Sequence, residues 1–151
     1  MMDTNTKLPA PLAEIVEDFS ISTGREKIDI LLHYSEAMPP LPERLQADHE
    51  QMDFVHECMT PVYVQAEMEN GGLHFYFDVP PESPTVRGLA AILAKGAEGA
   101  SPEEVLNIPA NFYQAMGLHE LITHQRLNGF TAILAHMKRL ATEHLENASA
   151  E

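Results

Sequence analysis

Residues 61–79 read Pro61-Val62-Tyr63-Val64-Gln65-Ala66-Glu67-Met68-Glu69-Asn70-Gly71-Gly72-Leu73-His74-Phe75-Tyr76-Phe77-Asp78-Val79, the most regular pattern in the chain. Apolar and polar side chains alternate on both sides of Asn70-Gly71-Gly72, which is typical of two strands joined by a tight turn. Since every second side chain of a strand points to the same face, this hairpin has one apolar face. We therefore expect helices to cover that face.

Helical periodicity precedes the hairpin. Apolar residues recur at helical spacing within residues 12–19 and again within residues 28–38, where the set is Ile28, Leu31, Leu32 and Met38. Pro39-Pro40 ends the second segment, because proline cannot continue a helix. Residues 41–49 show no clear period, so we expect a loop there.

Helical signals also follow the hairpin. Thr85 is expected to cap a helix that ends near Gly96 or Gly99. Ser101-Pro102-Glu103-Glu104 has the form of a capping box and predicts a short helix. Another short helix is expected over residues 111–117. The most amphipathic pattern predicts a last helix from about Arg126 to about Leu145.

These patterns predict an α+β fold. We expect a small antiparallel sheet, made of the hairpin 61–79 plus a possible third strand, with the N- and C-terminal helices packed on one face. A chain of 151 residues that is 44% hydrophobic can build one core. The expectation is a single domain over residues 1–151, with its core at about 10–146.

The charge balance bears on partners and location. Nine basic residues against 23 acidic ones give a formal charge of −14, which repels nucleic acid phosphates and anionic membrane surfaces. The longest aliphatic run, residues 89–94, is too short to span a bilayer, and the N-terminus shows no export signal. We therefore expect a cytoplasmic protein with no nucleic acid or membrane partner.

Cys58 is the only cysteine in the chain, and it lies where a loop runs into the hairpin. A lone thiol cannot form an internal disulfide, so Cys58 is either inert packing or a nucleophile. His56, if charged and on the same side, would lower the pKa of the thiol, whereas Glu57 would raise it. The sequence leaves this balance open.

Eight histidines and 23 carboxylates are potential metal ligands, but their spacing is unfavourable. The residues four positions after His49, His56 and His119 are not histidines, so the zinc motif His-Glu-x-x-His is absent. His136 and His144 are expected on a solvated helix face. The sequence therefore predicts no metal site. Arg126 could hold a carboxylate or a backbone carbonyl, or form an ordinary structural ion pair.

Around the cysteine the sequence resembles the SufE-type sulfur acceptor family, whose members are partners of cysteine desulfurases in iron–sulfur cluster assembly. The family pattern Asn-x-Val-x-Gly-Cys-x-Ser-x-Val-Trp stands here as Asp53-Phe54-Val55-His56-Glu57-Cys58-Met59-Thr60-Pro61-Val62-Tyr63. Further similarity lies at residues 86–93 and at Gln125-Arg126-Leu127-Asn128-Gly129-Phe130. Glu57 departs most from the pattern, because it adds a charge and removes the backbone freedom of glycine.

The resemblance implies a role for the thiol. Cys58 would take persulfide sulfur from a pyridoxal-phosphate-dependent cysteine desulfurase, stimulate that enzyme and pass the sulfur to a downstream iron–sulfur scaffold protein. Asp53, His56, Thr60 and Arg126 would be supporting or partner-binding residues, and the chain would need no cofactor of its own. This implies a sulfur-transfer accessory protein more than a stand-alone enzyme. Two alternatives stay open: an acidic regulatory module that binds a partner without using the thiol, and an independent cysteine hydrolase.

Overall fold

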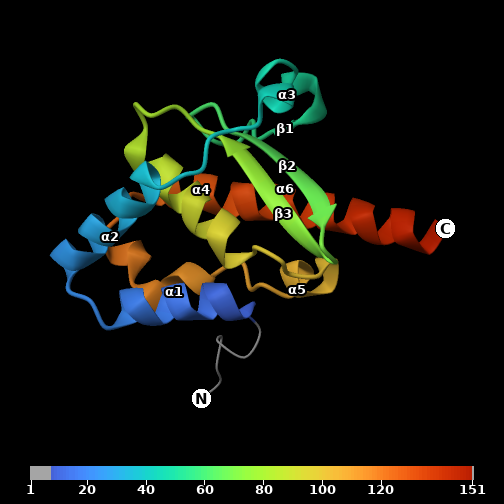
Figure 1. Cartoon of the computed structure of the whole chain (residues 1–151). Coiled ribbons are helices and arrows are strands. Elements are labelled where there is room, and N and C mark those ends of the chain that lie inside the picture. The colour runs from blue at the N-terminus through green and yellow to red at the C-terminus, as the bar shows by residue number, and fades with distance from the viewer. Residues whose placement is uncertain (1–7, 151) are drawn as a thin grey trace.

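The computed structural model describes residues 8–150 and has the expected α+β architecture. Figure 1 shows helices packed against a small twisted sheet. The elements in chain order are α1 (Ala10–Ser20), α2 (Gly24–Glu36), α3 (Glu43–Gln46), η2 (His49–Gln51), β1 (Asp53–Phe54), β2 (Tyr63–Glu69), β3 (Gly72–Asp78), α4 (Pro84–Gly96), α5 (Pro102–Leu106), η3 (Phe112–Met116), η4 (Leu118–Glu120) and α6 (His124–Ala150), where η marks a 3₁₀ turn.

The sheet is antiparallel, with strand order β1-β2-β3. Strands β2 and β3 pair from Tyr63↔Asp78 to Glu69↔Gly72, which confirms the predicted hairpin. At its turn Asn70 and Gly71 both have positive φ, 54° and 84°, as the favoured two-residue hairpin turns require. The third strand exists as the short β1, which pairs with the start of β2.

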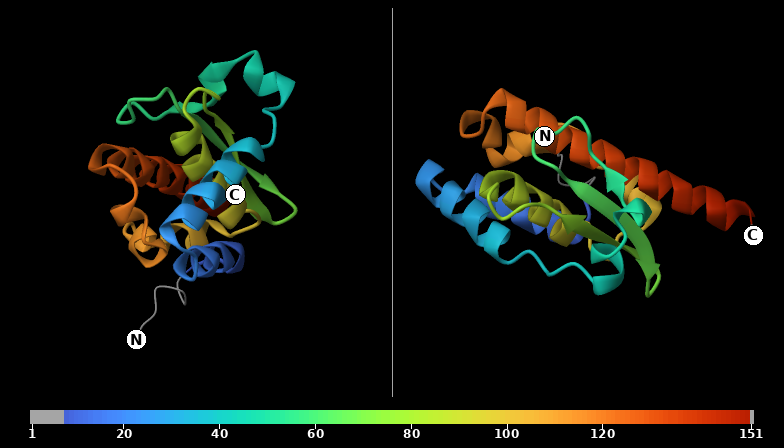
Figure 2. Two further views of the ribbon diagram at one scale, coloured as in Figure 1. Left: turned by 90° about the vertical axis from the view of Figure 1, so that its left-hand side faces the viewer. Right: turned by 90° about the horizontal axis from the view of Figure 1, so that it is seen from above.

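The apolar face of the hairpin is buried, as its alternation predicts. Helix α6 packs against β2 and helix α4 against β3, while α1 and α2 pack mainly against α4. Figure 2 shows α6 running along the sheet, with α4 between α6 and α2. The hairpin side chains that this packing buries are Val64, Ala66, Leu73, Phe75 and Phe77.

Three local expectations need correction. Residues 41–49 are not entirely loop, because they contain the single turn α3, which buries only Leu45 and so leaves no period in the sequence. Ile28 and Leu32 are 37% and 38% exposed, so only part of the predicted apolar face of α2 is covered. Helix α4 begins at Pro84, one residue before the expected cap Thr85.

Other helix signals are confirmed. Helix α5 begins with the predicted capping box, in which the side chains of Ser101 and Glu104 each accept a hydrogen bond from the other residue's backbone N–H. Gly117, at φ 74°, ends the short turn η3. Helix α6 extends further than expected at both ends. Among the helices of residues 8–150, none is both long and apolar enough to cross a membrane.

Candidate functional site

Cys58 lies in the loop that connects β1 to β2, hereafter the Cys58 loop, residues 55–62. The base of the loop is closed, because Val55 N–H donates to Val62 O at 2.9 Å and both side chains are fully buried. Within the loop Cys58 N–H donates to Val55 O at 3.2 Å and forms a turn. Figure 2 shows the loop arching over the first turns of α6. The only thiol of the sequence therefore lies in a short loop whose two ends are fixed by the buried residues Val55 and Val62.

The thiol packs against the backbone of α6. Cys58 is half-buried and contacts the hydrophobic core. Gly129 of α6 lies against it: a Cβ added there would lie 3.1 Å from Cys58 Sγ. Glycine therefore provides the space for the thiol, and the Arg126–Phe130 segment and the Cys58 loop meet although they are distant in the sequence.

Burial controls the ionisation of this thiol. Loss of hydration raises the pKa of Cys58, because an apolar environment disfavours the thiolate, and a hydrogen bond from the backbone of Thr60 offsets only part of that effect. We call this conformation, in which the thiol packs against α6, the closed loop. In the closed loop the Cys58 thiol is therefore less ionised at neutral pH than a free thiol.

Four charged side chains link the loop to α6, and we call them the His136 cluster: Asp53, Glu57, His136 and Arg139. His136 Nδ1–H donates to Asp53, and His136 Nε2–H donates to Glu57 Oε1 at 2.9 Å. Arg139 forms an ion pair with the other carboxylate oxygen of Asp53. The strand before the Cys58 loop and the residue next to Cys58 are thus both fixed to one helix.

The cluster shifts the pKa values of its members. Burial alone would lower the pKa of His136, but the hydrogen bonds with Asp53 and Glu57 outweigh it and raise the pKa. Burial would likewise raise the pKa of Asp53, but His136 and Arg139 lower it. The hydrogen bond from His136 also lowers the pKa of Glu57. Each of these pKa shifts favours the charged form of its side chain, so the cluster consists of an imidazolium between two carboxylates.

The structure brings some of the predicted site residues together and leaves others apart. Asp53 joins the His136 cluster, whereas His56 is 72% exposed and has its Nε2 3.8 Å from Glu57 Oε2. The Thr60 hydroxyl donates to the Ser83 hydroxyl at 3.3 Å, which ties the end of the loop to the start of α4. Arg126 is exposed on the first turn of α6, and its guanidinium makes no ion pair within residues 8–148.

Two residues at the site were missed by the sequence analysis. His136 was expected on a solvated face, but its side chain is only 13% exposed and bridges two carboxylates. Gly129 belongs to the arginine-bearing motif, but that motif does not predict its contact with the thiol. The hint for both was their place on α6: Gly129 lies in the arginine-bearing segment, and His136 follows it by two helical turns.

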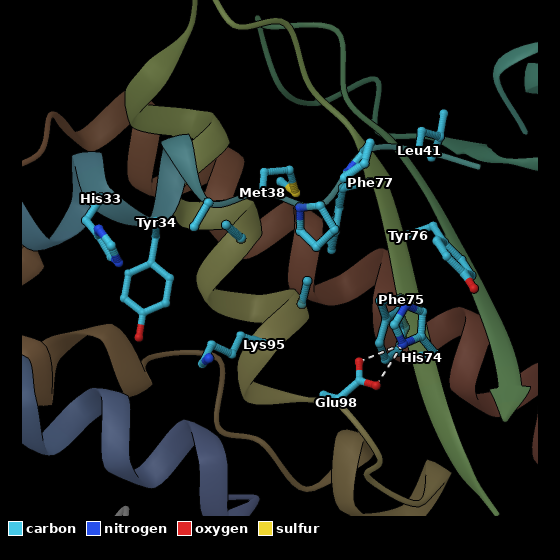
Figure 3. A pocket seen from close by; sticks show the side chains of 15 residues that line it. His33, Tyr34, Met38, Leu41, His74, Phe75, Tyr76, Phe77, Lys95 and Glu98 are labelled. Carbon is cyan, nitrogen blue, oxygen red and sulfur yellow. Dashed lines mark hydrogen bonds and ion pairs between the residues drawn. The ribbon is translucent and has the colours of Figure 1, made fainter. Parts of the chain in front are cut away.

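A separate apolar pocket of about 420 Å³ lies between α2, α4 and β3. Figure 3 shows Tyr34, Met38, Phe75 and Phe77 around it, with His74 paired to Glu98 at its rim. The lining contains no residue of the Cys58 loop and no member of the His136 cluster. This pocket is therefore distinct from the thiol site.

Comparison with known proteins assigns the family. The model of the SufE family, described as an Fe-S metabolism associated domain, matches residues 13–141. This chain belongs to the SufE family. The match covers the Cys58 loop, Gly129 and His136, so the SufE-family part of the chain contains the whole site described above.

Relatives of this SufE-family chain are found in distant organisms. An uncharacterized SufE-like protein of Mycobacterium tuberculosis is 37% identical over 143 residues, which cover 94% of this chain and 99% of the relative. The solution structure of a hypothetical protein from Thermus thermophilus has a TM-score of 0.82 and 37% identity, covering 92% of this chain and 98% of that one. The cysteine desulfuration protein SufE of Plasmodium vivax is 29% identical over 111 residues, which cover 72% of this chain and 43% of the relative.

Proposed function

We propose that this protein accepts a sulfur atom on Cys58 from the persulfide of a pyridoxal-phosphate-dependent cysteine desulfurase. It carries that sulfur to an iron–sulfur scaffold protein and stimulates the desulfurase by removing its product. The observation that carries the proposal is the place of the only cysteine, half-buried on a loop whose base is anchored. Family membership and the name of the Plasmodium vivax relative support the same role.

The chemistry needs one thiol and no cofactor. The Cys58 thiolate attacks the outer sulfur of the desulfurase persulfide, the S–S bond of that persulfide breaks, and the desulfurase cysteine leaves as a thiolate. Cys58 then carries the outer sulfur as a persulfide, and the reaction has no net oxidation or reduction. A neighbouring second thiol would release the sulfur by forming a disulfide. The sequence of this protein contains no second cysteine.

The loop must change conformation for this transfer. In the closed loop the thiol packs against Gly129, and burial raises the pKa of Cys58, so attack by a thiolate is disfavoured. The buried valines at the base limit the movement to the tip of the loop, residues 56–61. Contacts with α6 hold the tip, through Glu57 to His136 and through Met59 to Gln125. Binding of a desulfurase would replace these contacts and expose the thiol.

The remaining predicted residues have supporting roles in this proposal. Asp53 and Thr60 position the two ends of the loop through His136 and Ser83. His56 in the loop and Arg126 on the first turn of α6 are exposed and are available to the partner. Within residues 8–148 none of these four side chains forms a hydrogen bond with Cys58 Sγ, so we assign them to positioning and partner binding rather than to chemistry.

Intact-mass measurement tests the proposal. The protein is incubated with a cysteine desulfurase, cysteine and pyridoxal phosphate, with Cys58→Ser as the matched variant. The expected result is a gain of one sulfur mass that reductant reverses and that the variant lacks. Stimulation of the desulfurase by Cys58→Ser at the level of the parent would instead favour the acidic binding module. Turnover of small esters or amides without any partner would favour the cysteine hydrolase.

A further inference from the structure

Next to Cys58, three side chains from two elements point their potential metal ligands at one another. His56, Glu57 and His136 each offer one atom, and these atoms all lie within 4.8 Å of one another. His136 Nε2 is 2.9 Å from Glu57 Oε1, and His56 Nε2 is 3.8 Å from Glu57 Oε2. We propose that these three residues bind a divalent transition-metal ion, for which Zn²⁺ is the appropriate probe.

The ligand types fit such an ion. Two imidazoles and one carboxylate suit zinc and its neighbours in the first transition row, whereas Ca²⁺ and Mg²⁺ prefer oxygen ligands. Zn–N distances of about 2.0–2.1 Å place neighbouring ligands of a tetrahedral centre roughly 3.3 Å apart. The ligand atoms are therefore close to the required spacing, and rotation of the exposed His56 side chain can shorten its 3.8 Å distance from Glu57.

A second, independent observation supports His136 as a ligand. Its Nδ1–H donates to Asp53, and Arg139 pairs with the other oxygen of that carboxylate. A carboxylate on the far nitrogen is the arrangement that orients histidine ligands in zinc proteins, because it fixes Nδ1 as the donor and directs Nε2 at the metal. The ion would take the place of the proton that joins Nε2 to Glu57.

The position of the site predicts an effect on the thiol. His56 and Glu57 lie in the Cys58 loop, whereas His136 lies on α6, so one ion would link the loop to the helix. The link would hold Cys58 against Gly129 and oppose the movement of the tip. Three protein ligands leave a fourth position open, and Cys58 is not in the ligand set. Bound metal should therefore slow chemical modification of the Cys58 thiol without coordinating the thiol itself.

Zinc affinity tests the site directly. Binding is measured by competition with a chromogenic chelator in Cys58→Ser, so that the thiol cannot contribute a ligand. One equivalent of Zn²⁺ should bind, and excess Mg²⁺ should not compete. His136→Ala and His56→Ala should each weaken binding at least about tenfold, since losing even an outer partner of a metal ligand costs roughly 10–100-fold. Asp53→Asn should weaken it by a similar factor.

His119→Ala is the matched control. His119 also precedes a glutamate, and its Nε2 lies 4.0 Å from Glu120, but within residues 8–148 no third ligand joins that pair. Its removal should leave the affinity unchanged. Because His56 is exposed, His56→Ala should fold normally and keep the test decisive if His136→Ala does not.

The proposal is overturned if Cys58→Ser binds no stoichiometric Zn²⁺, or if His56→Ala binds it as tightly as its parent. A second readout uses the thiol-containing protein: one equivalent of Zn²⁺ should slow iodoacetamide labelling of Cys58 several-fold, and chelator should reverse this. No desulfurase takes part in either experiment. Failure of the metal site is therefore distinguishable from failure of the sulfur-acceptor function.

Discussion

Gly129 of α6 provides the space in which the Cys58 thiol lies. A Cβ at position 129 would be 3.1 Å from Cys58 Sγ and 3.7 Å from Cys58 Cβ, and the first of these is closer than ordinary van der Waals contact. Glycine in a helix interior costs about 0.5–1 kcal/mol relative to alanine. The close approach of the loop gives a physical reason for accepting that cost at this position.

Gly129→Ala should therefore favour the open loop. The added methyl group crowds the thiol in the closed loop, and a penalty of about 1 kcal/mol there would make the open loop roughly fivefold more populated. Iodoacetamide should label Cys58 faster by a similar factor. The measurement is the labelling rate at fixed pH, followed by intact mass.

Gly24→Ala is the control for this substitution. Gly24 is also helical, but a Cβ there would meet only Leu121 Cδ2, at an ordinary 3.5 Å. It should leave the labelling rate unchanged. Equal labelling rates in Gly129→Ala and the parent would show that the thiol does not depend on the space at Gly129.

Local patterns explain why the sheet and several helix ends could be predicted. The hairpin is an alternation of period two around Asn70-Gly71, and the start of α5 is a capping box, so both can be read from neighbouring residues. The single turn α3 could not, because it buries one side chain and a single residue has no period.

The site required tertiary structure. Cys58 could be found from its motif, but Glu57 and His136 are separated by 79 positions, and no spacing rule pairs them. The same separation conceals the proposed metal ligands, since metal motifs of the His-Glu-x-x-His type detect only ligands that share one helix. Burial of the thiol is likewise a property of packing against α6, not of the residues adjacent to Cys58.

The pH dependence of Cys58 labelling should follow from its burial. A raised pKa means that less thiolate is present at any given pH, so the folded protein should react more slowly than a free thiol and its rate should continue to rise at higher pH. The comparison is with the same protein unfolded in denaturant, with chelator present in both samples. A folded profile that lies at lower pH than the unfolded one would contradict the effect of burial.

Met59 should contribute to docking of the desulfurase. It follows Cys58 directly and is 79% exposed, so its side chain is accessible to a partner that binds at the thiol. Burial of such a side chain is worth about 1.5–3 kcal/mol, so Met59→Ser should raise the half-maximal concentration for desulfurase stimulation by roughly tenfold or more. Ile21→Ser is the matched control, because Ile21 is 75% exposed at the end of α1. Similar effects of both variants would exclude a specific role for Met59.

Arg126 should act on the partner rather than on the thiol. It lies three residues before Gly129 on α6, so it is a neighbour, on the helix surface, of the glycine that lies against Cys58. In a chain with a charge of −14, an exposed arginine at this place offers a specific contact for an acidic group of the desulfurase. Arg126→Ala should weaken stimulation several-fold at low salt, and less at high salt, where such charges are screened.

The matched control for Arg126 is Arg25→Ala, an exposed arginine at the start of α2. Both variants should keep the parent's thermal midpoint and its rate of Cys58 labelling, because both arginines are exposed. Only Arg126→Ala should alter the salt dependence of stimulation. A different result would contradict this role. If Arg126→Ala changed the rate of Cys58 labelling but left the salt dependence of stimulation unchanged, Arg126 would be a positioning residue of the loop and not a contact for the partner.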